Sequence, residues 1–274
     1  MPTWEEEQKC IWNSWLQDNF GDKLKRIRNA CLTLLERNKA RPPLPHFTHN
    51  NEVHFQNVEN LIHKLIPDHA FELLTPDERF YLLASACLHD IGMLPLVANP
   101  SGSPAQDDPQ RIRHHHHAIS QNYIVNCPED CGLDPCDAEP ISIICRFHRR
   151  FEDIEDCPDY HTANRPLAHD RDRIRTRLLP AYLRLADALD IDLHRTHAHY
   201  NALCLACNIP LEPKFHWVRS RLVSGILLDS RSHVVNVEFR KPTNPDLGDD
   251  KMWGTARIDG YRIDDFSGAG QYGN

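Results

Sequence analysis

Apolar residues recur at helical spacing through most of the first 190 positions. In KLKRIRNACLTLLERNK (residues 23–39) they return every three or four residues, so one side of a helix is apolar. We predict two helices between residues 3 and 39. The RPPLP segment at 41–45 then ends helical structure and forms a stiff linker, because proline lacks the N–H group that a helix interior requires.

Five further segments have the same helical spacing. They are VHFQNVENLIHKLIP (53–67), TPDERFYLLASACLHD (75–90), HHHHAISQNYIVN (114–126), AEPISIICRFHRRF (138–151) and DRIRTRLLPAYLRLADALDID (172–192). The second begins with Thr75, Pro76 and Glu78, the pattern of an N-terminal capping box. Between the segments, residues 95–110 are predicted to be a loop and residues 152–172 a long polar excursion.

The last of these helices has a clear apolar face. It is predicted to consist of Ile174, Leu178, Tyr182, Leu185, Ala186 and Leu189. Pro180 lies inside the segment, at a position where it is expected to kink the helix.

From about residue 216 the apolar positions follow a β pattern instead. RLVSGILLD, HVVNVEFRK and TARIDGYRI are β-rich, and the last alternates with period 2. The fold class predicted is therefore mainly α, a helical bundle with a small C-terminal β appendix. We predict an N-terminal helical extension and linker at 1–45, a core at 46–215, and a small β-rich region with a tail at 216–274.

Composition narrows the class of protein. The chain has 274 residues, 31 Lys and Arg against 39 Asp and Glu, and a net charge of −8, which argues against a protein that coats nucleic acid. No stretch has the roughly 20 apolar residues of a membrane span, and the acidic N-terminus MPTWEEEQKC lacks a signal-peptide core. With ten cysteines and no export signal, we expect reduced thiols, a cytoplasmic location and no membrane partner.

Histidine is unusually frequent, with 18 residues, and one histidine stands beside an aspartate. In LLASACLHDIGMLP (82–95) an apolar run ends at His89 and Asp90, which is explained either by a solvated helix end or by a metal site. A metal site needs partners on other helices. Candidates are His54, the run from His114 to His117, His148 and Asp187. Imidazoles with carboxylates are a ligand set for Zn, Fe, Mn or Mg.

The order His, His-Asp, His, His, Asp resembles the HD superfamily of metal-dependent phosphohydrolases. LLASACLHDIGM, RHHHHAIS, IICRFHR and LRLADALDID are similar to HD-type domains found in bacterial conflict systems and beside Hsp90-like ATPases, over roughly residues 46–240. The resemblance implies an all-α fold in which four residues bind one ion and Asp90 bridges to a second. The four are His54, His89, Asp90 and Asp187.

Two more histidines match members with a binuclear centre, namely His116 and His148. His116 is preferred because the family spacing places a small residue four positions later, here Ser120; His117 remains an alternative. The chain departs from the cyclic-di-GMP-cleaving branch, with Met93 in place of a lysine and RRF after His148 in place of GYP. HNN at 49–51 also replaces a common DHG.

The function this implies is a phosphohydrolase or phosphodiesterase that acts on a nucleotide or a short nucleic acid. Asp90 and His89 would be catalytic, with two divalent ions such as Mn, Fe, Mg, Zn, Ni or Co activating water. Candidate phosphate-binding residues are Arg113, Arg146 and Arg149, which are otherwise explained as a solvated basic helix end. Candidates for the second shell are His117, Asp190 and His194.

Two other functions fit the same residues. One is a nuclease that acts on single-stranded nucleic acid, and the other is a regulatory module that senses a nucleotide without turnover. The acidic balance favours a small nucleotide, and the complete ligand set argues against a degenerate sensor. A homo-oligomer is a further option that the sequence leaves open.

Overall fold

The computed structural model describes residues 20–38, 52–101, 108–158, 160–161, 173–191, 195, 211–229, 234–239, 257–258 and 261–262. The chain divides into two compact units. One consists of residues 1–45, 50–190 and 230–233; the other consists of residues 46–49, 191–229 and 234–274. His194 and the first of the two helices predicted between residues 3 and 39 lie outside the described residues.

The first unit is helical. Its α-helices are α2 (Phe20–Asn38), α3 (Glu52–Leu65), α4 (Asp68–Phe71), α5 (Pro76–Leu88), α6 (Pro95–Ala98), α7 (Pro109–Asn126), α8 (Pro135–Arg146) and α9 (Leu178–Leu189). Short 3-10 helices are η1 (Ile91–Met93), η3 (Glu129–Cys131) and η4 (Ile154–Asp156), and the strands β1 (Tyr160–His161) and β2 (Arg173–Ile174) form an antiparallel pair. The mainly helical fold class is confirmed.

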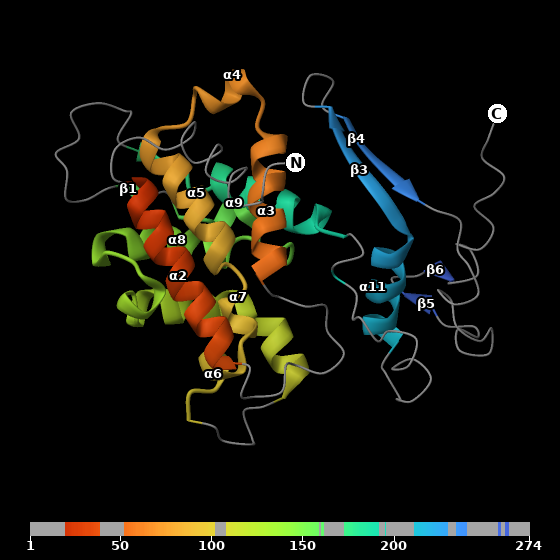
Figure 1. Ribbon diagram of the computed structural model, residues 1–274, viewed down its shortest axis with the longest axis horizontal. Helices are drawn as coiled ribbons and strands as arrows, with labels where there is room; N and C mark the ends of the chain where they lie inside the picture. Colours follow the sequence, from red (N-terminus) through yellow and green to blue (C-terminus); the bar gives the residue numbers. More distant parts are fainter. Residues whose placement is uncertain are drawn as a thin grey trace. The chain divides into compact units, whose positions relative to one another are not determined.

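Helix α5 is the centre of this unit, packed by α2, α3, α8 and α9 (Figure 1). Every residue from Phe80 to Leu88 is buried, which explains why its sequence is apolar all round instead of amphipathic. The ends of α5 are therefore fixed by neighbours on several sides, and whatever follows Leu88 begins from a rigid position.

The N-terminus of α5 is closed by the predicted capping box. Thr75 Oγ1 accepts the Glu78 N–H at 3.1 Å, and Glu78 Oε2 accepts the Thr75 N–H at 2.9 Å. Glu78 is fully buried and also bonds Arg175, through Nε at 2.8 Å and Nη2 at 2.6 Å. Burial raises the pKa of the Glu78 carboxyl. The hydrogen bonds from Arg175 and Thr75 lower this pKa by more, so that it lies below its ordinary value.

Helix α9 is shorter than predicted. It begins at Leu178, and Ile174 belongs to strand β2. Pro180 is the third helical residue, in the first turn, where its missing N–H leaves no helical bond unmade, so the kink prediction was wrong. Leu185 is 43% exposed, so the apolar face is also narrower than its pattern indicated.

Two boundaries near the histidines also differ from the prediction. The segment predicted to be a loop at 95–110 contains the one-turn helix α6 and the start of α7 at Pro109. Helix α8 ends at Arg146, so His148 stands in the turn after the helix and not on its last turn.

The second unit contains α11 (Leu211–Leu222), β3 (Val223–Asp229), β4 (Val234–Phe239), β5 (Arg257–Ile258) and β6 (Tyr261–Arg262). Strands β3 and β4 form an antiparallel hairpin with Ile226 opposite Val237, and β5 pairs with β6. The C-terminal β hairpin is confirmed, but strand structure starts at Val223 and not at 216. The preceding residues continue α11, where Trp217 and Val218 are buried.

Among the described residues, no helix has the length and apolar character needed to cross a bilayer. The seven cysteines that the structure describes are free thiols.

Candidate metal centre

The His89-Asp90 pair stands where α5 gives way to η1. His89 still has helical dihedral angles and donates its N–H to Ser85, whereas Asp90 leaves the helix at φ −107° and ψ 9°. The two residues therefore stand at the end of the buried helix α5, where the helical backbone conformation stops. This supplies the physical reason why an apolar run ends in two adjacent polar residues.

A close contact with α7 fixes the next turn. Gly92 donates its N–H to Ser120 Oγ at 2.8 Å, and that hydroxyl donates to the His89 carbonyl at 2.7 Å. A Cβ at Gly92 would lie 2.1 Å from the His116 carbonyl oxygen, so only glycine allows this approach. The contact between η1 and α7 brings His116 to Asp90.

One half of the centre combines α3, the end of α5 and α9. His54 Nε2 lies 3.1 Å from His89 Nε2 and 3.5 Å from Asp187 Oδ1, and both imidazole nitrogens lie 3.7 Å from Asp90 Oδ2. His89 Nε2 is 3.8 Å from Asp187 Oδ1. We refer to His54, His89, Asp187 and Asp90 Oδ2 as the first half-site.

The other half combines α7 and the turn after α8. His116 Nε2 lies 3.1 Å from Asp90 Oδ1 and 3.3 Å from His148 Nε2, and His148 Nε2 lies 3.5 Å from Asp90 Oδ1. We refer to His116, His148 and Asp90 Oδ1 as the second half-site. The two oxygens of Asp90 therefore face different pairs of histidines.

The hydrogen bonds of the outer ring nitrogens point every Nε2 lone pair inward. His89, His116 and His148 each place Nδ1 against the carbonyl oxygen three residues earlier, at 2.9, 2.7 and 2.6 Å, and His54 places Nδ1 at 2.6 Å from Asp190 Oδ2. An oxygen at Nδ1 selects the tautomer protonated there, which leaves Nε2 as a ligand. Facing Nε2 lone pairs repel unless a proton or cation lies between them.

The charges of Asp90 and His89 also indicate that a proton or a cation lies in the centre. Asp90 Oδ1 is buried, and among the described residues no donor is aligned to hydrogen-bond it. Burial raises the pKa of the Asp90 carboxyl, but His89 and His116 lower it well below its ordinary value. Burial lowers the pKa of His89, and the opposing effect of Asp90 and Asp187 raises it to about 8. In the metal-free protein, the negative charge of Asp90 and Asp187 is therefore balanced by protonation of an imidazole such as that of His89.

The separations suit a divalent metal. Four ligands about 2.0–2.1 Å from a tetrahedral zinc lie about 3.3 Å apart, and the nitrogen and oxygen atoms named above are separated by 3.1–3.8 Å. His54, His89 and Asp187 form one group with metal-ligand spacing, and His89, Asp90 and His148 form another. The residues present therefore fit divalent metal ions.

Asp190 supports the first half-site from outside. Besides His54, it binds the side chain of Asn57, whose Nδ2 donates to Asp190 Oδ1 at 2.9 Å. Asp190 was predicted for such a position, whereas Asn57 was missed. Its position three residues after His54 on α3 was the available signal, because residues three apart on a helix lie on one side.

His117 lies outside both half-sites. Its Nε2 is 2.6 Å from Glu152 Oε1, and Arg146 Nη2 pairs with the same oxygen at 2.9 Å. Burial lowers the pKa of His117 to about 4, so it is neutral at neutral pH. No sequence pattern pointed to Glu152, which lies in the turn beyond His148.

The three arginines predicted to bind phosphate lie near the second half-site in different ways. Arg149 Nη1 donates to the carbonyls of Arg113 and His114 and lies 3.2 Å from His116 Nδ1. The structure places Arg113 next to the centre through its carbonyl oxygen, and Arg146 pairs with Glu152. Arg149 is the guanidinium in contact with a candidate ligand.

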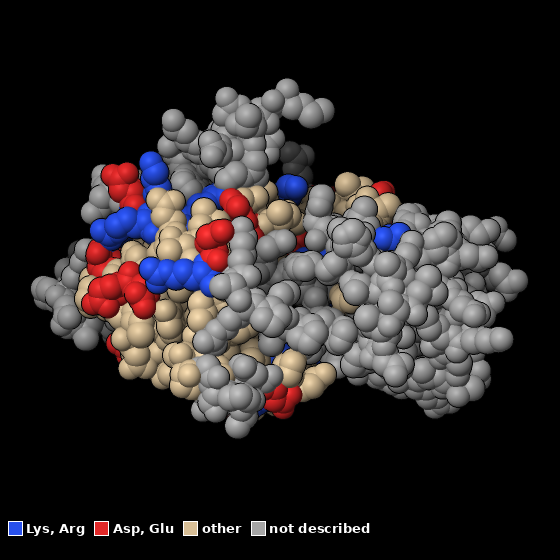
Figure 2. All heavy atoms as spheres, turned by 60° about the horizontal axis from the view of Figure 1, so that its bottom comes forward, with Lys and Arg blue, Asp and Glu red and all other residues tan. Residues whose placement is uncertain are grey.

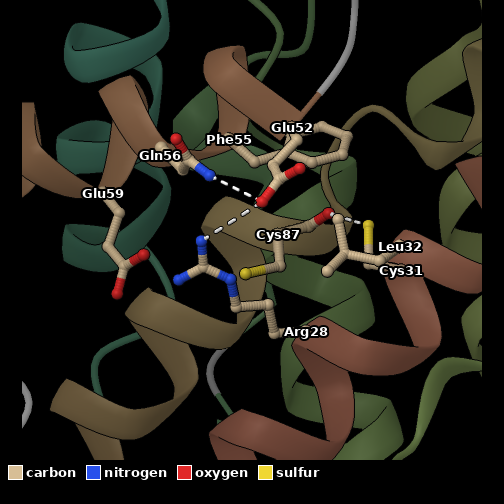
Figure 3. A pocket seen from close by; sticks show the side chains of 8 residues that line it. All are labelled: Arg28, Cys31, Leu32, Glu52, Phe55, Gln56, Glu59 and Cys87. Atoms are coloured by element: carbon tan, nitrogen blue, oxygen red, sulfur yellow. Dashed lines mark hydrogen bonds and ion pairs between the residues drawn. The ribbon is translucent and has the colours of Figure 1, made fainter. Parts of the chain in front are cut away.

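A separate small pocket lies among α2, α3 and α5 (Figure 3). Its lining contains none of the half-site residues; it comprises Arg28, Cys31, Leu32, Glu52, Phe55, Gln56, Glu59 and Cys87. Gln56 donates to Glu52 Oε1 at 2.8 Å, and Cys31 Sγ donates to the Cys87 carbonyl at 3.1 Å. Burial raises the pKa of the Cys87 thiol to about 12, which keeps it protonated and unreactive.

The bundle and its buried histidines and aspartates define a helical domain of the HD class. The HD-CE family model matches residues 44–260, and the chain belongs to this family, within the HD superfamily. The resemblance found in the sequence is thereby confirmed. Neither the curated proteins nor the solved structures contain a match to the chain.

Proposed function

We propose that this protein is a metal-dependent phosphohydrolase or phosphodiesterase that hydrolyses a phosphate ester of a nucleotide or nucleic acid at a binuclear metal centre. The observation that carries the proposal is the position of Asp90, whose Oδ2 faces His54 and His89 while its Oδ1 faces His116 and His148. A carboxylate with two histidine pairs on opposite oxygens supports a centre that holds two cations.

In this proposal the metal ligands, the exposed side of Asp187 and the charge of Arg149 have different roles. The two half-sites would hold divalent ions, which would supply polarisation of phosphoryl oxygens and an activated water for attack on phosphorus. Asp187, with its side chain 30% exposed, marks the side from which a substrate reaches the centre. Arg149 places a permanent positive charge beside His116, where it would offset negative charge that grows on the phosphate oxygens.

The surface supports a small substrate. On the face shown in Figure 2, Lys and Arg are interspersed with Asp and Glu over the described part of the chain and form no continuous basic band. Together with the net charge of −8, this favours a nucleotide or a short nucleic acid over a long polyanion.

The test combines metal analysis with a substrate screen. The full chain is loaded with Mn²⁺, bound metal is counted by mass spectrometry, and hydrolysis is measured on nucleoside mono- and triphosphates, cyclic nucleotides and short single-stranded DNA and RNA. We expect two ions per chain and turnover of one of these classes. Asp90→Asn, which keeps the shape but removes the charge, should release metal and reduce turnover to background.

Three results separate the alternatives. Turnover confined to oligonucleotides identifies a nuclease. Tight nucleotide binding without turnover identifies a sensor and overturns the enzyme proposal. Full activity in Asp90→Asn would falsify the binuclear mechanism, provided that circular dichroism shows both proteins folded alike.

A further inference from the structure

The turn that carries His148 is fixed from three helices. Arg184 on α9 donates through Nη2 to the carbonyls of Phe147 and Glu152, at 2.8 and 2.9 Å. The Glu152 carboxylate binds His117 on α7 and Arg146 on α8. Each end of the turn is therefore held by charged hydrogen bonds, which gives its side chains defined positions.

This rigid turn exposes a large aromatic side chain. Phe151 is 66% exposed, although Phe147, Arg149 and Glu152 in the same turn are hydrogen-bonded to α7 or α9. Burial of a phenylalanine side chain stabilises a fold, and the Phe151 ring makes little of that contribution. The exposed ring is therefore available for contact with a molecule outside the chain.

The surroundings of the ring indicate which kind of molecule. The guanidinium carbons of Arg149 and Arg150 lie 5.3 and 4.6 Å from its centroid, within cation–π range. Arg149 also contacts His116 of the second half-site, with Nη1 3.2 Å from Nδ1. A single guanidinium thus links the exposed ring to the metal centre, with two positive charges beside the ring.

We propose that Phe151 is a stacking platform for the base of a nucleotide whose phosphate lies at the metal centre. The inference rests on the proposed function and specifies its substrate as a nucleobase joined through a sugar to the phosphate. Every base has a π face, so an aromatic platform binds bases with little regard to their identity. The flanking arginines add charge for the phosphate next to that base.

The test measures binding in the absence of turnover. The Mn²⁺-loaded full chain is titrated calorimetrically with the methylene phosphonate analogues of adenosine 5′-phosphate and ribose 5-phosphate, which cannot be hydrolysed at the ester position. We expect the adenosine compound to bind about tenfold more tightly, as base–aromatic stacking predicts. Phe151→Ala should abolish this difference and leave the ribose compound unchanged, whereas Phe151→Trp should preserve it.

Leu73→Ala provides the matched control, because Leu73 is an equally exposed apolar residue, at 69%, in the turn before α5. It should alter neither affinity. Equal binding of the two analogues, or an unchanged ratio in Phe151→Ala, overturns the platform even when hydrolysis is normal. A base preference that depends on Phe151 in a protein without turnover supports the platform and rejects only the enzyme proposal. A short oligoadenylate tested alongside distinguishes a free nucleotide from a nucleic-acid end.

Discussion

The two half-sites use the same imidazole chemistry with different support. In the first, Asp187 adds a carboxylate and Asp190 polarises His54 from outside at 2.6 Å. In the second, both histidines rest on neutral backbone carbonyls, and Asp90 Oδ1 is the negative charge shared with its neighbour. Arg149 even places a positive charge beside His116.

This difference in charge predicts that the two half-sites bind metal ions with different strength. A cation in the first half-site meets two carboxylates and a histidine made more basic by a third, so it should bind more tightly. A cation in the second half-site meets half of that charge and a nearby guanidinium. It should exchange more readily and depend more on an anionic substrate to complete its coordination. The asymmetry therefore predicts two unequal metal affinities.

Removing one ligand from each half should give the largest effects. Asp187→Ala should lower the tighter affinity by more than the roughly 10–100-fold that outer partners contribute, because it removes a direct negative ligand. His148→Ala should abolish the weaker ion and leave the tighter one in place. Mn²⁺ titration by calorimetry, with mass-spectrometric counts, measures both. Simultaneous loss of both ions in each variant would mean that the two half-sites bind metal as one unit, which would contradict the prediction of two unequal affinities.

Weakening the outer support should give an intermediate effect confined to the first half. Asp190→Asn replaces the carboxylate beside His54 by a neutral amide of the same shape, so the tighter affinity should fall about 10–100-fold while the weaker one is unchanged. Asn57→Ala, which removes only the hydrogen bond to Asp190, is the graded control and should lose less. The same Mn²⁺ titration decides, and an equal fall in both affinities contradicts the asymmetry.

Much of the helical unit could be predicted from the sequence. Helical periodicity located the helices of the bundle, and the pattern of Thr75, Pro76 and Glu78 located the capping box of α5, because burial and capping leave local patterns. It misplaced the start of α9, since Ile174 has the right spacing but pairs in β2. Likewise, His148 follows α8 in sequence without a signal that marks the helix end before it.

The metal centre could be predicted from the sequence only in part. The residue types and their order suggested the ligands, and the structure brings the six into one cluster. The polar residues that surround them could not be predicted in the same way. Asn57 and Glu152 are ordinary polar residues, and their partners Asp190 and His117 lie 133 and 35 positions away in the sequence. Such contacts depend on tertiary packing, which a pattern along one chain does not encode. His194, predicted for the second shell, lies outside the described residues.

The two metal affinities should also depend on pH. Metal binding needs unprotonated Nε2 atoms, and His89, with a pKa of about 8, must release a proton below that pH. The tighter affinity should rise about tenfold per pH unit as the pH increases towards 8, because one proton is exchanged. Burial lowers the pKa of His148, so proton competition from this residue in the second half-site should end below about 6.5.

Stability of the metal-free protein should change with the opposite sign. The raised pKa of His89 means that its protonated form contributes stability that is fully present below the unfolded value of about 6.5 and is lost as the pH rises through about 8. Urea unfolding at pH 6 and pH 8.5, with and without Mn²⁺, measures both trends. Metal should therefore stabilise the fold more at pH 8.5 than at pH 6, and an equal metal effect at the two values would remove His89 as the group that competes with the tighter ion.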